Sequence, residues 1–250
     1  MSQLQKVYGI HVVEALLKHH VKRLKQLWVL TGREDPRMQV IIQQANKYHI
    51  PIQLLTRDEL DALMANEVTH QGIIAEVSPS QVWSEAMLQE MLERLTDTPL
   101  LLALDNITDP HNLGACLRTA DAAGVQAVII PKDKSATLNA TVRKVACGAA
   151  EVIPLVAVTN LVRTLEKLQQ RGLWIVGTAG EAEQQIYQQD LTIPTVLVMG
   201  AEDKGMRRLT RECCDYLVKL PMLGSVSSLN VSVASGICLF EVVRQRTNIS

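Results

Sequence analysis

Three short segments of the sequence place polar side chains among glycine and other small residues, a composition that suits a ligand site. The first, Asn112-Leu-Gly-Ala-Cys-Leu-Arg118, supplies an amide and a guanidinium. The second, Met199-Gly-Ala-Glu-Asp-Lys-Gly205, supplies carboxylates after a glycine, and the third, between Leu220 and Ala234, supplies hydroxyl and amide groups. Such groups can hold a polar substrate, and small residues let a flat ligand come close.

Each of these polar residues also has an ordinary structural explanation. Ser227 and Ser228 are good N-cap residues for a C-terminal helix, and Asn230 in its first turn would be a satisfied cap. Arg118 comes six residues after Asn112, so we expect both on roughly one face of a helix near its N-terminus. A lone arginine is more often a surface residue. Taken singly, these residues favour the structural explanation.

The three segments follow apolar runs that predict the strands of a buried sheet. Leu100-Leu-Leu-Ala-Leu104 is continuously apolar, which is typical of a strand covered on both faces. Further strands are predicted at 125–130, 152–155, 173–176, 196–199 and 216–220, and helices at 113–123, 160–170 and 228–246. This pattern predicts a mostly parallel α/β domain over residues 100–250, in which ligands bind beyond the carboxyl ends of the strands. All three segments lie there.

The first part of the chain predicts a separate, smaller α/β domain over residues 1–77. Helices are expected at 7–17, 36–48 and 57–64, and strands at 27–30, 52–55 and 73–77. Residues 78–99 change in composition, because Ser-Pro-Ser-Gln opens this stretch and Thr-Asp-Thr-Pro closes it around a short acidic helix at 84–95. We interpret residues 78–99 as an interdomain linker.

Composition argues against several classes of protein. No apolar run is long enough to cross a bilayer, and the first residues lack the apolar core of a signal peptide. The 5 cysteines contain no C-x-x-C pair and the 6 histidines show no metal-ligand spacing, so we expect no disulfide framework, no metal site and a reduced cytoplasm. The sequence contains no G-x-G-x-x-G motif, so a Rossmann dinucleotide or Rossmann methyltransferase site is not supported. The net charge of -1 restricts any nucleic-acid contact to local patches.

Taken together, the three segments, in this order and near this spacing, resemble the motifs of the SpoU (TrmH-type) RNA ribose 2′-O-methyltransferases of the SPOUT superfamily. The resemblance covers nearly the whole chain, including Tyr8-Gly-Ile-His-Val-Val, and is strongest to the bacterial enzymes that methylate a guanosine of 23S rRNA. It implies an L30e-like α/β substrate-binding domain, an α/β-knot methyltransferase domain, S-adenosylmethionine as cofactor, 23S rRNA as partner and a homodimer. The family usually has glycine at the position of Asp203, so the turn here departs from the family pattern.

The resemblance also assigns roles to individual residues. It makes Arg118 the catalytic arginine with Asn112 as its positioning partner, and Glu202 orients Arg118 or hydrogen-bonds the ribose. Ser228 and Asn230 complete the catalytic set. Arginine is a poor base, since its pKa exceeds about 12. Either a neighbour or an RNA phosphate shifts this pKa, or Arg118 orients the ribose and stabilises charge instead, and the sequence leaves these alternatives open. The cofactor is expected at three loops after strands, through Thr178, Val198, Gly200, Leu220, Met222, Ser228 and Leu229.

Other interpretations stay open beside this one. The basic run from Lys18 to Lys25 and the cluster of Arg207, Arg208 and Arg211 are either phosphate contacts or solvated helix surfaces. A catalytically silent RNA-binding module is one alternative function, although the intact motif residues argue against it, and 2′-O-methylation of tRNA is another. A nucleotide-binding metabolic enzyme would need a phosphate loop, which the sequence lacks.

Overall fold

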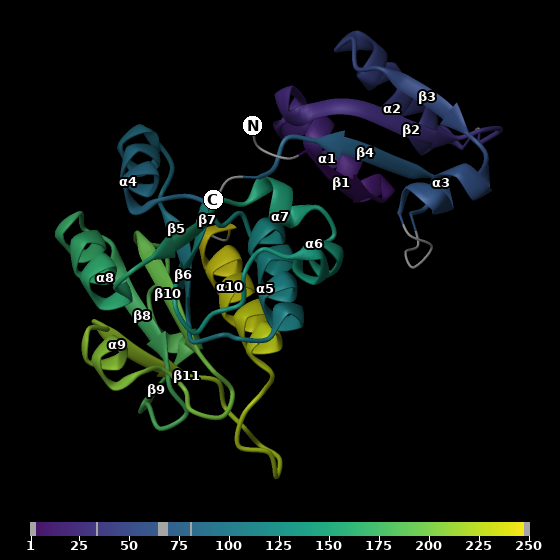
Figure 1. The fold of residues 1–250 in the computed structure, drawn as a ribbon. Coiled ribbons are helices and arrows are strands. Elements are labelled where there is room, and N and C mark those ends of the chain that lie inside the picture. Colours follow the sequence, from purple (N-terminus) through teal and green to yellow (C-terminus); the bar gives the residue numbers. More distant parts are fainter. Residues whose placement is uncertain (1–3, 34, 65–69, 81, 248–250) are drawn as a thin grey trace. The chain divides into compact units, whose positions relative to one another are not determined.

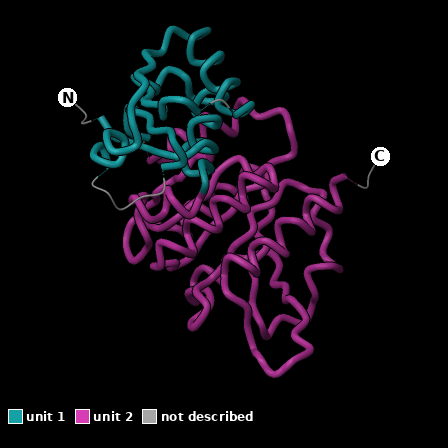
Figure 2. Tube along the Cα trace, turned by 90° about the vertical axis from the view of Figure 1, so that its right-hand side faces the viewer, with its two compact units in different colours: residues 1–81, 147–152 teal, residues 82–146, 153–250 magenta. Residues whose placement is uncertain are grey.

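The chain forms two compact units, which Figure 2 colours separately. The computed structural model describes residues 4–33, 35–64, 70–80 and 82–247. The first unit comprises residues 1–81 together with 147–152, and the second comprises 82–146 and 153–250. Among the described residues, no helix is long and apolar enough to cross a membrane, and no three His, Cys, Asp or Glu side chains gather as metal ligands.

The first unit is built on a four-stranded sheet in the order β1-β4-β2-β3. Only β2 and β3 pair in parallel. Helices α1 and α2 pack on one face of the sheet, and α3 covers part of the other. The elements are β1 (Gln5–Tyr8), α1 (Ile10–His19), η1 (Val21–Arg23), β2 (Leu24–Leu30), α2 (Pro36–Lys47), β3 (Ile52–Leu55), α3 (Arg57–Leu63), β4 (Ile73–Val77) and α7 (Ala149–Val152).

Strand β1 occupies the start of the segment for which the sequence predicted a helix from residue 7. Val7 and Tyr8 pair with β4, and the helix begins only at Ile10. The break falls at Gly9, whose φ of 97° is a conformation that residues with a Cβ rarely adopt. The predicted start was wrong because helical spacing of apolar residues does not reveal a short strand that pairs with a distant one.

The second unit is a seven-stranded sheet in the order β7-β6-β5-β10-β8-β11-β9, in which every pair is parallel. Every residue of β5 is buried, as its unbroken apolar sequence predicted. Helices α5, α6 and α10 cover one face and α4, α8 and α9 the other (Figure 1). The strands are β5 (Leu100–Asp105), β6 (Ala127–Pro131), β7 (Leu155–Val158), β8 (Trp174–Thr178), β9 (Gln184–Gln185), β10 (Thr195–Gly200) and β11 (Tyr216–Lys219).

The helices of this unit are α4 (Glu85–Arg94), α5 (Pro110–Ala122), α6 (Ala140–Ala146), α8 (Leu161–Gln170), η2 (Ile186–Gln188), α9 (Arg208–Glu212) and α10 (Val231–Thr247). The predicted mixed α/β class is confirmed, and a knot in this unit stays a prediction. The strand predicted at 152–155 was wrong, because Val152 ends α7 and Pro154, which lacks an N–H, precedes β7.

Two features of the chain depart from a simple succession of domain, linker and domain. The stretch expected to be a linker contains α4, whose Leu88 is fully buried in the core of the second unit. Residues 147–152 belong to the first unit although they follow α6 of the second. Their Glu151 is 4% exposed and pairs with Arg23 of η1 at 2.6 Å, which supplies the partner that a buried carboxylate needs.

Candidate functional site

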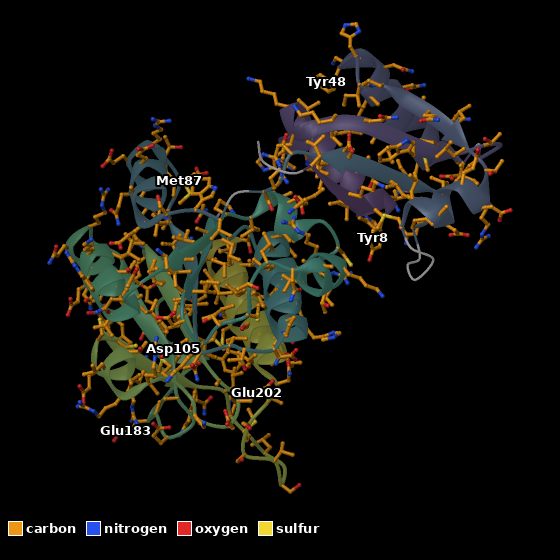
Figure 3. All side chains as sticks on the ribbon, viewed as in Figure 1. Tyr8, Tyr48, Met87, Asp105, Glu183 and Glu202 are labelled. Carbon is orange, nitrogen blue, oxygen red and sulfur yellow. The ribbon has the colours of Figure 1, made fainter. Side chains whose placement is uncertain are left out.

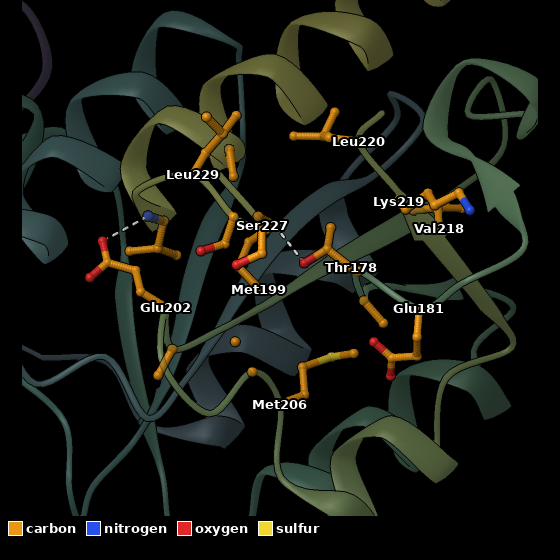
Figure 4. Close-up of a pocket in the computed structure, with 18 of the residues that line it drawn as sticks. Thr178, Glu181, Met199, Glu202, Met206, Val218, Lys219, Leu220, Ser227 and Leu229 are labelled. Atoms are coloured by element: carbon orange, nitrogen blue, oxygen red, sulfur yellow. Dashed lines mark hydrogen bonds between the residues drawn. The ribbon is translucent and has the colours of Figure 1, made fainter. Parts of the chain in front are cut away.

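The carboxyl end of the sheet in the second unit is hollowed by a cavity of about 690 Å³ (Figure 4). Strand β10 lies between β5 and β8, so strands distant in the sequence meet at the centre of the sheet, where parallel α/β sheets place ligands. Loops after β8, β10 and β11 surround the cavity. Its lining residues are 178–181, 199–202, 204–206, 211, 218–222, 227–229, 231 and 234.

Glu202, which lines this cavity, belongs to a network of two amides and one carboxylate. Asn112 Nδ2 donates a hydrogen bond to Glu202 Oε1 over 3.3 Å, and Asn230 Nδ2 donates to Asn112 Oδ1 over 2.9 Å. Asn230 Nδ2 also donates to Glu202 Oε1, which accepts a further bond from the Val231 N–H at 3.0 Å. Asn112, Glu202 and Asn230, called the amide–carboxylate network below, thus bring all three sequence segments together.

The network also begins helix α10. The Asn230 side chain accepts a hydrogen bond from Ser232 N at 3.0 Å, and its carbonyl accepts from Ala234 N at 2.9 Å. Glu202 adds a negative charge at this N-terminus, where the helix dipole favours it. Asn230 is therefore the cap, which confirms the structural explanation predicted for this residue, and the prediction of Ser227 and Ser228 as N-cap residues was wrong. The sequence rule favoured serine but does not separate three suitable residues within four positions.

The loop that carries Glu202 folds back on itself directly after β10. Ala201 and Gly205 exchange backbone hydrogen bonds of 3.1 and 2.7 Å. A Cβ on Gly200 would lie 2.2 Å from the backbone of Gly205 and Met206, so only glycine fits there. Asp203 needs no positive φ, because Gly205 takes that conformation at 63°. The loop therefore closes with aspartate where the family usually has glycine.

A buried ion pair fixes the end of the same loop. Asp105 at the end of β5 is fully buried and accepts hydrogen bonds from Arg207 N at 2.8 Å and from Arg207 Nε at 2.7 Å. Gly200 pairs with Asp105 in the sheet, so both ends of the loop meet at this one residue. Figure 3 shows Asp105 and Glu202 at the same end of the second unit.

Arg118 lies on α5 with its side chain exposed. Six residues turn a helix by about 600°, which leaves the side chains of Arg118 and Asn112 about 120° apart around the axis. The expectation that they share a face was wrong, since Asn112 points to Glu202 and Asn230. A partnership of Arg118 with Glu202 stays a prediction.

Most of the predicted cofactor residues line the cavity. They are Thr178, Gly200, Leu220, Met222, Ser228 and Leu229. Val198 does not, because its side chain is fully buried in the core and the alternation of β10 directs the next residue, Met199, to the cavity. The Val198 carbonyl nevertheless accepts a hydrogen bond from Thr178 Oγ1 at 3.3 Å. A side chain on Gly200 would meet the backbone of Gly205 and Met206, so this glycine is needed for the packing of the loop more than for open space in the cavity.

Sequence reasoning missed several charged residues of the cavity. Glu181, Lys204 and Lys219 line it, and so does Arg211, which had been considered only as part of a basic cluster. Thr178-Ala-Gly-Glu181 begins at the last residue of β8, as Gly200-Ala-Glu202 begins at the last residue of β10, so a glutamate two or three residues after the end of a strand was a signal available in the sequence.

The arginines after the Glu202 loop are each paired with a carboxylate. Arg207 binds Asp105, Arg208 binds Glu212 at 2.7 Å and Arg211 binds Glu181 at 2.5 Å. They are therefore neither a uniform basic patch nor a uniformly solvated surface.

The cysteines beside the site are unsuited to nucleophilic chemistry. Burial raises the pKa of Cys116 to about 11 and that of Cys214 to about 12. Both thiols are protonated at neutral pH, and a thiol attacks only as its thiolate. The chemistry of the site is therefore left to its amide, carboxylate, hydroxyl, guanidinium and ammonium groups.

Comparisons with known proteins agree with this arrangement. The family model described as SpoU rRNA Methylase matches residues 99–240, and the one described as RNA 2′-O ribose methyltransferase substrate binding matches 6–83. A Pseudomonas aeruginosa protein named 23S rRNA (guanosine-2′-O-)-methyltransferase RlmB is 74% identical over 99% of both chains.

Solved structures give the same fold. The crystal structure of an RNA 2′-O ribose methyltransferase has a TM-score of 0.77 at 25% identity, over 98% of this chain and 90% of that one. The SpoU methyltransferase AviRb from Streptomyces viridochromogenes, in complex with the cofactor AdoMet, also has a TM-score of 0.77, at 24% identity over 98% and 91%.

Proposed function

The chain belongs to the SpoU rRNA methylase family, and on that premise we propose that it transfers a methyl group from S-adenosylmethionine to the 2′-hydroxyl of a guanosine in 23S rRNA. The observation that carries this proposal is the amide–carboxylate network. It joins residues 90 and 118 positions apart and includes Glu202, which lines the cavity in which a bound cofactor can meet an RNA hydroxyl.

The residues of the cavity fit S-adenosylmethionine. Met199, Leu220, Met222 and Leu229 offer apolar surface for a flat adenine, and the strand-end loops offer backbone groups for its ring nitrogens. When bound, the cofactor supplies an electrophilic methyl group on a sulfonium, so the protein must chiefly align the hydroxyl and help to remove its proton.

The chain's own residues divide this work as follows. Glu202 is held by Asn112, Asn230 and the Val231 N–H, which fixes polar groups that can receive the ribose hydroxyls. Ser228 lies at the cavity beside Leu229 and is available to the cofactor or the ribose. Arg118 is exposed and offers a planar fork of donors that can hold a phosphate and a ribose oxygen together.

The direct test is the choice of acceptor by the purified full-length chain with S-adenosylmethionine carrying a labelled methyl group. We expect label in 23S rRNA that is recovered as 2′-O-methylguanosine at one position, and none in tRNA. Label in tRNA with none in 23S rRNA would move the proposal to the tRNA alternative. RNA binding without transfer to either acceptor would favour the catalytically silent module.

The first unit is proposed to bind the RNA without supplying chemistry. Within the basic run from Lys18 to Lys25, Arg23 pairs with the buried Glu151 and is therefore not available to RNA. Lys25 Nζ donates a hydrogen bond to the Lys22 carbonyl at 3.1 Å. Lys18, Lys22 and Lys25 remain exposed for phosphate.

Replacing these three lysines by glutamate should raise the KM for 23S rRNA and make this KM depend less on salt concentration. The affinity for S-adenosylhomocysteine should stay unchanged. Lys47→Glu, a like change at the end of α2, is the control. Unchanged KM and salt dependence in the triple variant would exclude the run from RNA binding.

A cytoplasmic homodimer is also proposed, with α10 at its interface. Val233 and Phe240 of this helix are 51% and 49% exposed and, two helical turns apart, lie on one face that a second copy of the chain can cover. Phe240→Ser should therefore weaken self-association, measured by sedimentation at micromolar concentration. A mass of one chain for the unmodified protein would contradict the dimer.

A further inference from the structure

The cavity has a second carboxylate that the proposed methyl transfer does not use. Among its described lining residues the acidic ones are Glu202 and Glu181, and Glu202 is occupied by the amide–carboxylate network. Glu181 follows β8 and lies across the cavity from Glu202, with its carboxylate directed inward (Figure 4).

Glu181 is paired with a cation that also lines the cavity. Arg211 of α9 approaches Glu181 Oε1 to 2.5 Å, and their side chains are 44% and 57% exposed. An exposed ion pair contributes little to stability, about 0–1 kcal/mol, so folding alone gives little reason for this pair at a ligand cavity. One anionic and one cationic group stand side by side where a ligand can reach both.

We propose that Glu181 and Arg211 form the subsite for the amino-acid end of S-adenosylmethionine, with Glu181 binding its ammonium group and Arg211 its carboxylate. This inference rests on the proposed function, since it concerns the cofactor of that reaction. The ammonium and carboxylate of an α-amino acid are attached to one carbon, so their partners must be neighbours. Glu181 and Arg211 meet this requirement, and the zwitterion replaces one exposed ion pair by two.

Other ligand groups match the pair less well. An RNA phosphate would be attracted by Arg211 but repelled by Glu181. The ribose diol of the cofactor could use Glu181 but would leave Arg211 without a role. A zwitterion is the part of the cofactor that uses both charges.

The test compares two ligands that differ only in the amino-acid end. S-adenosylhomocysteine carries it, whereas 5′-methylthioadenosine has the same adenine, ribose and thioether without it. Their Kd values are measured by calorimetry on the full-length chain and on Glu181→Gln and Arg211→Gln. Arg208→Gln is the matched control, because Arg208 forms an exposed pair with Glu212 on the same helix and does not line the cavity.

We expect each cavity variant to bind S-adenosylhomocysteine about tenfold or more weakly, the usual size of a lost charged hydrogen bond. Binding of 5′-methylthioadenosine should stay unchanged, which also shows that the variants are folded, and Arg208→Gln should alter neither ligand. Equal weakening of both ligands by Glu181→Gln would assign Glu181 to the ribose and overturn the subsite. Unchanged binding of both ligands would make the pair a surface contact. If the unmodified chain binds neither ligand, the proposed cofactor itself fails.

Discussion

Two neighbouring segments at the cavity differ in how many hydrogen bonds their polar groups form. In the first, Asn112, Glu202 and Asn230 bond to one another and begin α10. In the second, residues 221–229, called the apolar loop here, form no backbone hydrogen bond with another part of the described chain. Leu223 and Val226 of this loop are 98% and 60% exposed.

This difference separates positioning from binding. The amide–carboxylate network is held by hydrogen bonds between groups of this chain, so the protein itself positions the groups assigned to the RNA hydroxyl. The apolar loop exposes side chains that gain contacts only when a ligand or a second copy of the chain covers them. Perturbing the first should damage catalysis, and perturbing the second should damage affinity.

The largest effect is expected from Glu202→Ala. The substitution removes the acceptor shared by Asn112, Asn230 and the Val231 N–H, so the network loses its centre. Single-turnover methylation of 23S rRNA should fall about a hundredfold or more, the usual consequence of misplacing groups by an ångström. Glu212→Ala on α9 is the control, because Glu212 is exposed and pairs only with Arg208 among the ion pairs described. A rate near that of the unmodified protein would show that the network is not needed.

A paired glycine experiment compares the Glu202 loop and the apolar loop directly. A Cβ at Gly200 would meet backbone at 2.2 Å, whereas a Cβ at Gly224 of the apolar loop meets nothing within 4 Å. Gly200→Ala should cost about 1–3 kcal/mol through overpacking, which lowers Tm by roughly 2–10 °C for a chain of this size, and should slow methyl transfer. Gly224→Ala should leave both nearly unchanged. Equal melting temperatures for the two variants would remove the packing explanation of Gly200.

A smaller effect is expected in the hydrogen-exchange rates of backbone amides when S-adenosylhomocysteine is added. The unpaired amides of the apolar loop should exchange fast and slow down about tenfold or more when the ligand is bound. Amides of the first turn of α10, which the network already holds, should change much less. If the ligand instead slowed exchange in the first turn of α10 and left the apolar loop unchanged, the assignment of the loop to ligand binding would be wrong.

Much of the fold could be predicted because the relevant signals are local. The continuous apolar run of β5 indicates burial on both faces. The motif segments lie in the helix after β5, at the end of β10 and in the loop after β11. Glu202, Asn112 and Asn230 stood out as polar side chains among small residues, but their roles in a site came from the resemblance to the SpoU family and not from local signals.

What escaped prediction depends on distant contacts. Neither the pairing of β1 with β4 nor the docking of Glu151 on Arg23 leaves a local signal, since the partners of the ion pair are 128 residues apart. The burial of Leu88 likewise makes α4 part of the second unit rather than a linker. The pair of Glu181 and Arg211 was missed because a charge run was considered without the carboxylates that the fold brings to it.

The central claim is that residues of this chain align a ribose hydroxyl for methyl transfer, and Arg118 tests it most directly. Single-turnover transfer to 23S rRNA is measured at saturating RNA and cofactor for Arg118→Ala and Arg118→Lys, with S-adenosylhomocysteine affinity alongside. If the planar fork positions the ribose, lysine cannot replace it. Both variants should then lose about a hundredfold in rate while ligand affinity stays unchanged. A rate near that of the unmodified protein for Arg118→Ala would contradict the account, and full activity for Arg118→Lys alone would reduce the role of Arg118 to its charge.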